Sequence, residues 1–367
     1  MFAQKPKTPE GPGLLDRIVA SGCQRVAILG LHPRAGTRTV LTGLVRKVHA
    51  KDWPLGVTSA PRLPLEQEIE AGPDSQPVTR IALPEGVLLA TAEGTLPGTE
   101  AGLDLVEMTA SETPLGRVAI YRVTRGGEVD LHGPSRSGGM GEVLGRLGEV
   151  SGGLVLVDGG WERRGFAAPG SADGTLLVVG ASYSASFERS AAAARYVVET
   201  LTVPPCDEPA RLAWEEIASS GAAALLDSRG RPAGVLPPRL DDPVRALKAP
   251  DGSPVSAVVL PHGLNDEFMI PLVRSPLRCS LVVLDATRIN VAPIYFKAWL
   301  KGKGRIQVVR PMRLVAMATN PRNEAGPDAD PEEFRAMVAE ALPHLPVHDV
   351  VLESGGEPRK PVWKFWE

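Results

Sequence analysis

The hydrophobic positions of this chain follow two alternating patterns. Short uninterrupted apolar runs, among them RVAILG (25–30) and GLVLVDGG (153–160), are typical of strands buried on both faces of a sheet. Between such runs lie stretches with apolar residues at helical spacing, such as LLDRIVASG (14–22) and FERSAAAARYVVETL (187–201). Buried strands that alternate with helices predict an α/β fold, with a mainly parallel sheet flanked by helices.

A proline-rich segment interrupts this alternation in the middle of the chain. TVPPCDEP (202–209) separates the first group of strands and helices from a second one. Beyond it the pattern resumes with a predicted helix at 210–220 and a predicted buried strand at 280–287. We therefore expect two domains, residues 1–203 and a second α/β domain at 204–367.

The composition narrows the classes of partner and the cellular location. The formal net charge of -3 provides no electrostatic footprint for nucleic acid or for an anionic membrane. No apolar run approaches the roughly 20 residues that cross a bilayer. The chain has 3 cysteines, which lie far apart in sequence and lack metal-ligand spacing, so reduced thiols are expected. The N-terminal MFAQKPKTPEGPG lacks the apolar core of a signal peptide. These features predict a cytoplasmic protein with no nucleic-acid or membrane partner.

The segment GLHPRAGTRT (30–39) is the strongest candidate for chemistry. It links a predicted buried strand to a predicted helix, which is the setting of a phosphate-binding loop. Such loops bind anions because backbone N–H groups and a helix N-terminus point at the ligand. Gly36 supplies the turn that this geometry needs. The predicted nucleotide-binding residues are Arg34, Ala35, Gly36, Thr37, Arg38 and Thr39.

Two side chains of a working loop are replaced. Thr37 stands where the phosphate-binding lysine belongs, and Arg38 stands where a magnesium-binding Ser or Thr belongs. Loss of one charge-assisted hydrogen bond, about 1.5–3 kcal/mol, weakens binding by about ten- to a hundredfold. Arg34, inside the loop, is the better substitute cation, and Thr39 still offers a hydroxyl to magnesium. The alternative interpretation is a glycine turn into a helix that binds nothing.

Asp158 ends the apolar run LVLVD, as the acid that orients magnesium does in phosphate-transferring loop proteins. It is therefore the second predicted metal ligand, with Thr39. An aspartate that only caps the next turn produces the same pattern. Asp285 in LVVLDATRI has this appearance too, so the signal by itself leaves both interpretations open.

Several segments along most of the chain, in order, match one known family. The matching runs include LLDRIVASGCQRVAILG, TAEGTLPGTEAGLDLVEMT, LVLVDGGWERRGFAAP, LLVVGASYSAS and DPEEFRAMVAEALPHLPVHDV. The sequence resembles the P-loop subunit of the lysine 5,6-aminomutase reactivase. The resemblance implies a P-loop NTPase-like fold for the first domain, and ATP or another nucleotide with magnesium as its ligands.

The candidate loop departs from the family pattern. The family carries a K-N-A-G-K-T-T-like loop, which corresponds here to PRAGTRT at 33–39. Gly36 and Thr39 keep this pattern, whereas both lysines and the first threonine are replaced. The family's D-G-A-I-D-R-K segment corresponds to DGGWERR at 158–164, in which Asp158 is retained. The resemblance is therefore to a family member with a degenerate loop, in which any partner-coupled ATP hydrolysis is impaired.

The resemblance implies an accessory role. Such a reactivase uses nucleotide to release damaged cobalamin from an aminomutase that depends on adenosylcobalamin and pyridoxal phosphate. Its P-loop subunit works with a second subunit resembling MutS-type ATPases. We therefore expect an accessory protein of a cobalamin-dependent aminomutase in lysine degradation, binding nucleotide weakly if at all. Two alternatives are a non-enzymatic scaffold and, disfavoured by the missing lysine, a P-loop small-molecule kinase or ligase.

Overall fold

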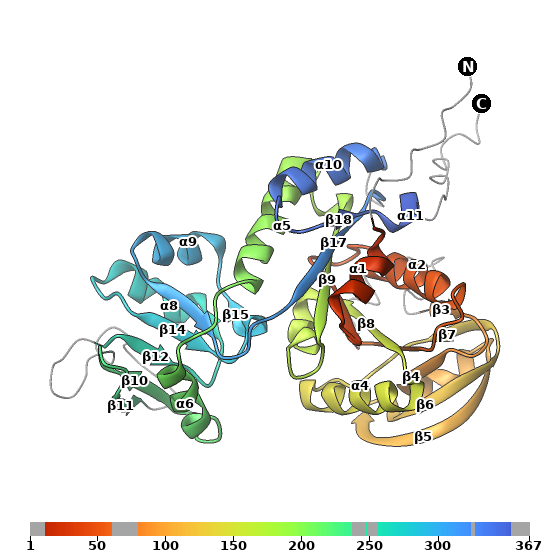
Figure 1. Cartoon of the computed structure of the whole chain (residues 1–367), viewed down its shortest axis with the longest axis horizontal. Coiled ribbons are helices and arrows are strands. Elements are labelled where there is room, and N and C mark those ends of the chain that lie inside the picture. Colours follow the sequence, from red (N-terminus) through yellow and green to blue (C-terminus); the bar gives the residue numbers. More distant parts are fainter. Residues whose placement is uncertain (1–11, 61–79, 237–246, 248–254, 324–326, 354–367) are drawn as a thin grey trace. The chain divides into compact units, whose positions relative to one another are not determined.

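The structure is a computed structural model that describes residues 12–60, 80–236, 247, 255–323 and 327–353. These residues separate into two compact units (Figure 1). One unit holds the chain up to Arg195 together with the chain from Arg313 onward, and the other is Tyr196–Met312. None of the described helices is long and apolar enough to cross a membrane.

The first unit is built on a 9-stranded sheet with the order β18-β17-β9-β1-β8-β2-β4-β6-β5. Every neighbouring pair from β18 to β4 is parallel, and the two pairs at one edge, β4 with β6 and β6 with β5, are antiparallel. The predicted α/β class with a mainly parallel sheet is therefore confirmed. In sheet order, the strands are Val347–His348, Leu314–Asn320, Gly174–Gly180, Arg25–Gly30, Leu154–Gly160, Leu55–Ser59, Leu88–Ala92, Gly116–Arg125 and Gly102–Thr113.

The two units differ from the predicted division into 1–203 and 204–367. Strand β17 pairs in parallel with β9, so the end of the described chain completes the first sheet. Helices α10 (Pro331–Ala341) and α11 (Val350–Glu353) belong to the same unit. The apolar pattern of 314–320 indicates a buried strand but does not say which sheet receives it, because strand pairing depends on long-range contacts.

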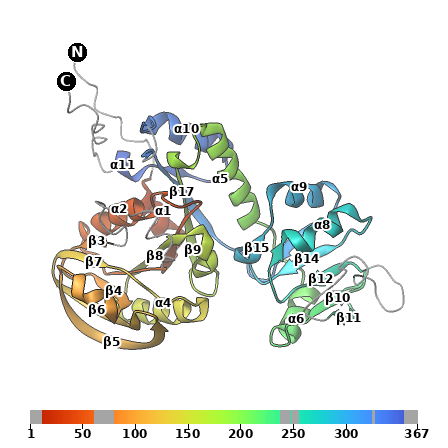
Figure 2. The same cartoon turned by 180° about the vertical axis from the view of Figure 1, so that it is seen from behind.

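Helices cover both faces of the first sheet (Figures 1 and 2). Leu55 and Val57 of β2 share a core with α2 (Thr37–His49), whereas the Cα of Gly56 faces Leu147 of α4 (Ser137–Ser151). Because successive residues of a strand point to opposite faces, α2 and α4 lie on opposite sides of the sheet. Helices α1 (Leu14–Ser21) and α5 (Phe187–Leu201) are two further described helices, and the division between the units falls within α5, after Arg195.

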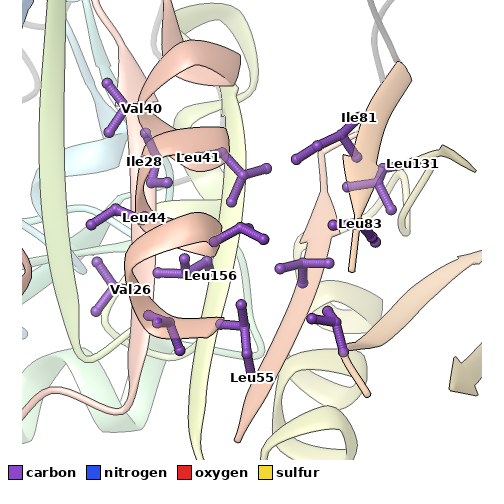
Figure 3. Close-up of a cluster of buried hydrophobic side chains, with 14 of the residues drawn as sticks. Val26, Ile28, Val40, Leu41, Leu44, Leu55, Ile81, Leu83, Leu131 and Leu156 are labelled. Carbon is purple, nitrogen blue, oxygen red and sulfur yellow. The ribbon is translucent and has the colours of Figure 1, made fainter. Parts of the chain in front are cut away.

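The main core lies between α2 and the centre of the sheet. Val40, Leu41 and Leu44 of α2 face Ile28 of β1 and Leu156 of β8, and all five side chains are fully buried (Figure 3). Their spacing of 1, 3 and 4 residues puts them on one helix face, which the sequence pattern requires of an amphipathic helix. A two-stranded antiparallel ribbon of β3 (Arg80–Leu83) and β7 (Gly127–Asp130) extends this core.

The second unit has its own 5-stranded sheet, with the order β11-β10-β12-β14-β16. In that order the strands are Pro232–Leu236, Ala223–Leu226, Ala257–Val259, Ser280–Val283 and Arg305–Val308. The accompanying helices are α6 (Glu208–Ile217), α8 (Asp266–Arg274) and α9 (Pro293–Lys301). A short parallel pair, β13 (Leu264–Asn265) and β15 (Ile289–Asn290), lies beside them. Helix α6 packs on β10 and β12 through a small core of its own.

Candidate functional site

The candidate loop lies at the centre of the first sheet. It follows β1, whose neighbours are β8 and β9, and it ends where α2 begins at Thr37. In the register of the sheet, Gly30 is opposite Gly160 on one side and Val178 on the other. The carboxyl ends of these parallel strands therefore meet at one edge, which is where open α/β sheets bind ligands.

The loop is anchored to the end of β9 (Gly174–Gly180) and to the residues just after it. Leu31 N donates to Val178 O at 2.9 Å, and Ser182 Oγ donates to Arg34 O at 3.4 Å. The His32 ring makes two further contacts, from Gly180 N to Nε2 at 3.1 Å and between Nδ1 and Pro33 O at 2.6 Å. Because an amide N–H can only donate, Nε2 accepts and the ring proton lies on Nδ1. The imidazole is thus neutral, in agreement with burial that lowers the pKa of His32.

The turn into α2 depends on glycine. Gly36, the residue before the helix, has φ +100°, and Arg34 also has a positive φ of 60°. A Cβ at Gly36 would lie 2.4 Å from Nδ2 of Asn320, the buried last residue of β17. The first N–H groups of a helix have no intrahelical acceptor, and α2 has no side-chain cap. The helix start thus keeps its capacity to bind an anion, while Asn320 covers Gly36 on one side.

The predicted site residues face in different directions. Ala35 and Thr37 are buried, Arg34 is exposed, and Arg38 is half-buried. Thr37 Oγ1 donates to Asp158 Oδ2 at 3.4 Å, and Arg38 Nε lies 3.7 Å from the same oxygen. Within the described part of the chain, Asp158 is therefore reached by Thr37 and Arg38 and not by Thr39. The hydroxyl beside the acid belongs to the residue that replaces the lysine.

Asp158 is a buried carboxylate with few partners. It lies in β8 opposite Ile28, and its side chain is 1% exposed. Its Oδ1 is buried and has no hydrogen-bond partner among the described residues. The side chain of Arg38, 15% exposed, supplies the nearest positive charge. Where a working loop holds magnesium near this acid, the present chain holds a guanidinium of its own.

Basic side chains also follow the strand that carries Asp158. In the turn Trp161–Ala167, the guanidinium of Arg164 lies over the Trp161 ring, 4.8 Å from its centre. Arg163 Nε is buried without a hydrogen-bond partner among the described residues. Burial, and then the charge of Arg163, lower the pKa of His132, so these two side chains are close. This end of β8 therefore carries two arginines, next to the acid Glu162 of the same turn.

Two contributors to this site were not predicted from the sequence. His32 fastens the loop to Gly180, and Asn320 packs on Gly36 from a strand 284 positions further along the chain. His32 at least lies inside the candidate loop, where its ring can reach backbone atoms. Asn320 ends the apolar run LVAMATN, which gives no signal of a neighbour so far away in sequence.

The chain was compared with protein-family models, curated proteins and solved structures, and none of them matches. The described residues contain no group of three or more His, Cys, Asp or Glu side chains arranged to hold a metal ion. Functional interpretation therefore depends on the residues and contacts of this chain alone.

Proposed function

We propose that this chain is a P-loop NTPase-like accessory protein whose loop has lost hydrolysis. Its role is that of a reactivase-type partner of a cobalamin-dependent aminomutase, and a MutS-like subunit supplies ATP turnover. Nucleotide binds the loop weakly and without magnesium. The observation that carries this proposal is the pairing of Arg38 with Asp158 at the head of α2.

The arrangement of the elements supports a nucleotide-type loop. The strand with the acid, β8, is the immediate neighbour of β1, and the loop joins β1 directly to α2. Phosphate oxygens would lie over residues 34–39, where the helix N-terminus and its free amide capacity attract an anion. Arg34 is exposed on this loop and brings a guanidinium to the same edge of the sheet.

The chemistry of the acid supports the loss of hydrolysis. Phosphoryl transfer depends on magnesium held near the acid and on a cation that neutralises the developing charge. A magnesium ion beside Asp158 would have to displace Arg38, whose guanidinium already lies 3.7 Å from the carboxylate. Loss of a single transition-state donor lowers a rate by about 10²–10³. Loss of both lysine and metal therefore leaves a loop that binds without turning over.

A non-enzymatic scaffold is the second candidate. The packing of Asn320 on Gly36 favours it, because this contact closes part of the surface over the loop. His32 strengthens the same interpretation, since its neutral ring fixes the loop to Gly180 with no ligand involved. In that case the chain assembles its partners through its surface, and the loop is a structural connection.

Restoration of the lost side chains separates these two candidates. The variant Thr37→Lys with Arg38→Thr is compared with native protein by calorimetry with ATP, in magnesium and in EDTA. We expect native protein to bind with equal affinity in both buffers, and the variant to bind about ten- to a hundredfold more tightly in magnesium only. Thr124→Lys with Arg125→Thr makes the same two changes at an exposed pair on β6 and should behave as native.

Each other outcome decides between the candidates. If neither protein releases heat at millimolar ATP, the loop is not a nucleotide site and the scaffold remains. If native protein hydrolyses ATP steadily by itself, the non-hydrolysing assignment is wrong. The partner role is measured by adding the chain and the MutS-like subunit to inactivated aminomutase with fresh adenosylcobalamin. Reactivation should require this chain, and full reactivation without it would overturn that role.

A further inference from the structure

A cavity of about 560 Å³ lies in the same unit as the loop. It is bounded by α1, by the far end of α2, by α10 and by the chain around β18 and α11. Lys47 on its wall is ten residues along α2 from Thr37, which corresponds to about 15 Å of helix. The cavity is thus separate from the candidate nucleotide loop, and its volume is in the usual range for small-molecule sites.

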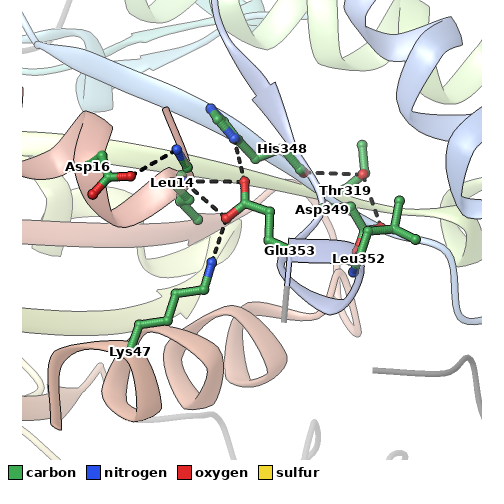
Figure 4. Close-up of polar contacts among 9 residues, drawn as sticks. Leu14, Asp16, Lys47, Thr319, His348, Asp349, Leu352 and Glu353 are labelled. Carbon is green, nitrogen blue, oxygen red and sulfur yellow. Dashed lines mark hydrogen bonds and ion pairs between the residues drawn. The ribbon is translucent and has the colours of Figure 1, made fainter. Parts of the chain in front are cut away.

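The cavity wall includes the carboxylate of Glu353, and both of its oxygens accept hydrogen bonds (Figure 4). Glu353 accepts hydrogen bonds from Leu14 N at 3.1 and 3.2 Å, from Lys47 Nζ at 2.6 Å and from His348 Nδ1 at 2.6 Å. Burial by itself would raise the pKa of Glu353, but these donors lower it to about 2. The carboxylate is therefore charged at neutral pH, and the charge of Lys47 is compensated.

Three other nitrogen groups of the cavity wall have no such partner. His348 gives Nδ1–H to Glu353, and its Nε2 is buried without a hydrogen bond. The Nε atoms of Arg17 and Arg335 are also buried without a hydrogen bond among the described residues. Neither Arg17 nor Arg335 forms an ion pair with any residue that the structure describes. Buried polar groups without a protein partner are rare in folded proteins, and a functional role is one of the accepted explanations.

The charges around the cavity favour an anion. The charged residues that line the cavity are three basic side chains, Arg17, Lys47 and Arg335, and two acidic side chains, Asp16 and Glu353. Asp16 is occupied by the N–H of Gly13 at 3.1 Å, and Glu353 is saturated. The excess positive charge therefore belongs to the two guanidinium groups. The rest of the wall is apolar: Pro12, Ala339, Leu342, Pro343, Leu345, Pro346 and Val347.

We propose that this cavity binds a small organic anion, a carboxylate or phosphomonoester with an apolar body. Arg17 and Arg335 hold the anionic group, since guanidinium groups match both carboxylate and phosphate geometry. The His348 ring, whose orientation Glu353 sets, lines the site, and the apolar residues contact the ligand body. This site is independent of the proposed nucleotide loop. Because α1 and α11 form part of its wall, ligand binding would depend on how these two helices are arranged.

The first test uses the full native chain and small probe anions. Binding of phenyl phosphate, benzoate, inorganic phosphate and neutral benzyl alcohol is measured by calorimetry. We expect phenyl phosphate or benzoate to bind at least about tenfold more tightly than benzyl alcohol, because the alcohol cannot form charge-assisted bonds. Preference between the two anions distinguishes a phosphomonoester site from a carboxylate site. No heat from either anion at millimolar concentration would overturn the proposal.

The second test assigns the anion to the two arginines. Arg17→Gln with Arg335→Gln should weaken binding of the preferred probe by about tenfold or more. Arg122→Gln with Arg189→Gln removes two exposed arginines of the same unit and should leave binding unchanged. Equal affinity in all three proteins would contradict the proposed site. The loop variants described above should also keep native affinity for the probe, so this proposal and the nucleotide proposal fail independently.

A third measurement needs no variant. Phenylglyoxal modifies accessible arginines, and peptide mass spectrometry identifies which ones react. The bound probe should slow modification of Arg17 and Arg335 and leave Arg122 and Arg189 unaffected. Protection of all four arginines, or of none, would contradict binding in this cavity even if the double variant does not fold.

Discussion

Two buried carboxylates of the first unit differ sharply in how well they are bonded. Glu353, 6% exposed at its side chain, accepts bonds from an amide, an ammonium and an imidazole, the closest at 2.6 Å. Asp158, 1% exposed, has a hydroxyl at 3.4 Å and a guanidinium at 3.7 Å. One of its oxygens has no partner among the described residues. Both side chains are almost fully hidden from water, but only Glu353 has its charge fully compensated.

The difference separates two uses of a buried acid. The contacts of Glu353 join α11 to α1 and α2, so they fasten one end of the described chain to the other. Asp158 contributes little to such a framework, since a buried charge with poor contacts lowers stability. Incompletely bonded groups occur most often at sites kept for function. Asp158 therefore fits a functional or formerly functional position, and Glu353 fits a structural one.

The largest expected effect follows substitution of the well-bonded acid. Glu353→Gln removes the negative charge and places an amide NH₂, which is a donor, against one of two other donors, Lys47 Nζ or His348 Nδ1. We therefore expect the unfolding free energy to fall by about 3 kcal/mol. Urea unfolding, read through hydrogen exchange of the β1 and β17 amides, measures it. Glu188→Gln removes an exposed carboxylate that accepts hydrogen bonds from Ser186 Oγ and from its own backbone N–H, and it should leave stability nearly unchanged. A similar small change for both variants would remove the structural role of Glu353.

A comparable but gradual effect is expected in acid. The pKa of Glu353 is about 2 in the folded chain against an ordinary value of 4.5. Its stabilisation is therefore complete above pH 4.5 and is lost as the pH falls toward 2, by an amount of about 3 kcal/mol. The measured quantity is the difference in unfolding free energy between native protein and Glu353→Gln. This difference should shrink across that window, and a constant difference would contradict the low pKa.

The smallest effect is expected at the poorly bonded acid. Asp158→Asn removes a buried charge that has one distant guanidinium partner, and the asparagine oxygen can still accept from Thr37. The lost attraction and the relieved desolvation offset each other, so unfolding free energy should change by less than about 1 kcal/mol in either direction. The same hydrogen-exchange measurement applies. A loss as large as that of Glu353→Gln would show that the two acids have the same structural importance.

Local features of this comparison were predictable and long-range ones were not. The strand RVAILG, the turn at Gly36 and the helix that follows are predictable from neighbouring residues, as is the place of Asp158 in a buried strand, although that strand continues to Gly160. The pairing of Arg38 with Asp158 was not recognised, because 120 residues separate them in sequence. The network around Glu353 was not recognised either, since it joins α1, α2 and β18 from both ends of the described chain.

Hydrophobic periodicity in the chain is enough to predict an α/β protein with a mainly parallel sheet, because the spacing of apolar residues within each strand or helix shows which of its faces is buried. Which strands become neighbours is decided only when the chain folds. Residues 314–320 lie in the second half of the chain and were assigned to the second domain. In the folded protein they pair with β9 of the first sheet, where Asn320 contacts Gly36. Partners of a buried charge are likewise chosen across the whole sheet, since electrostatic contacts act through space and not along the chain.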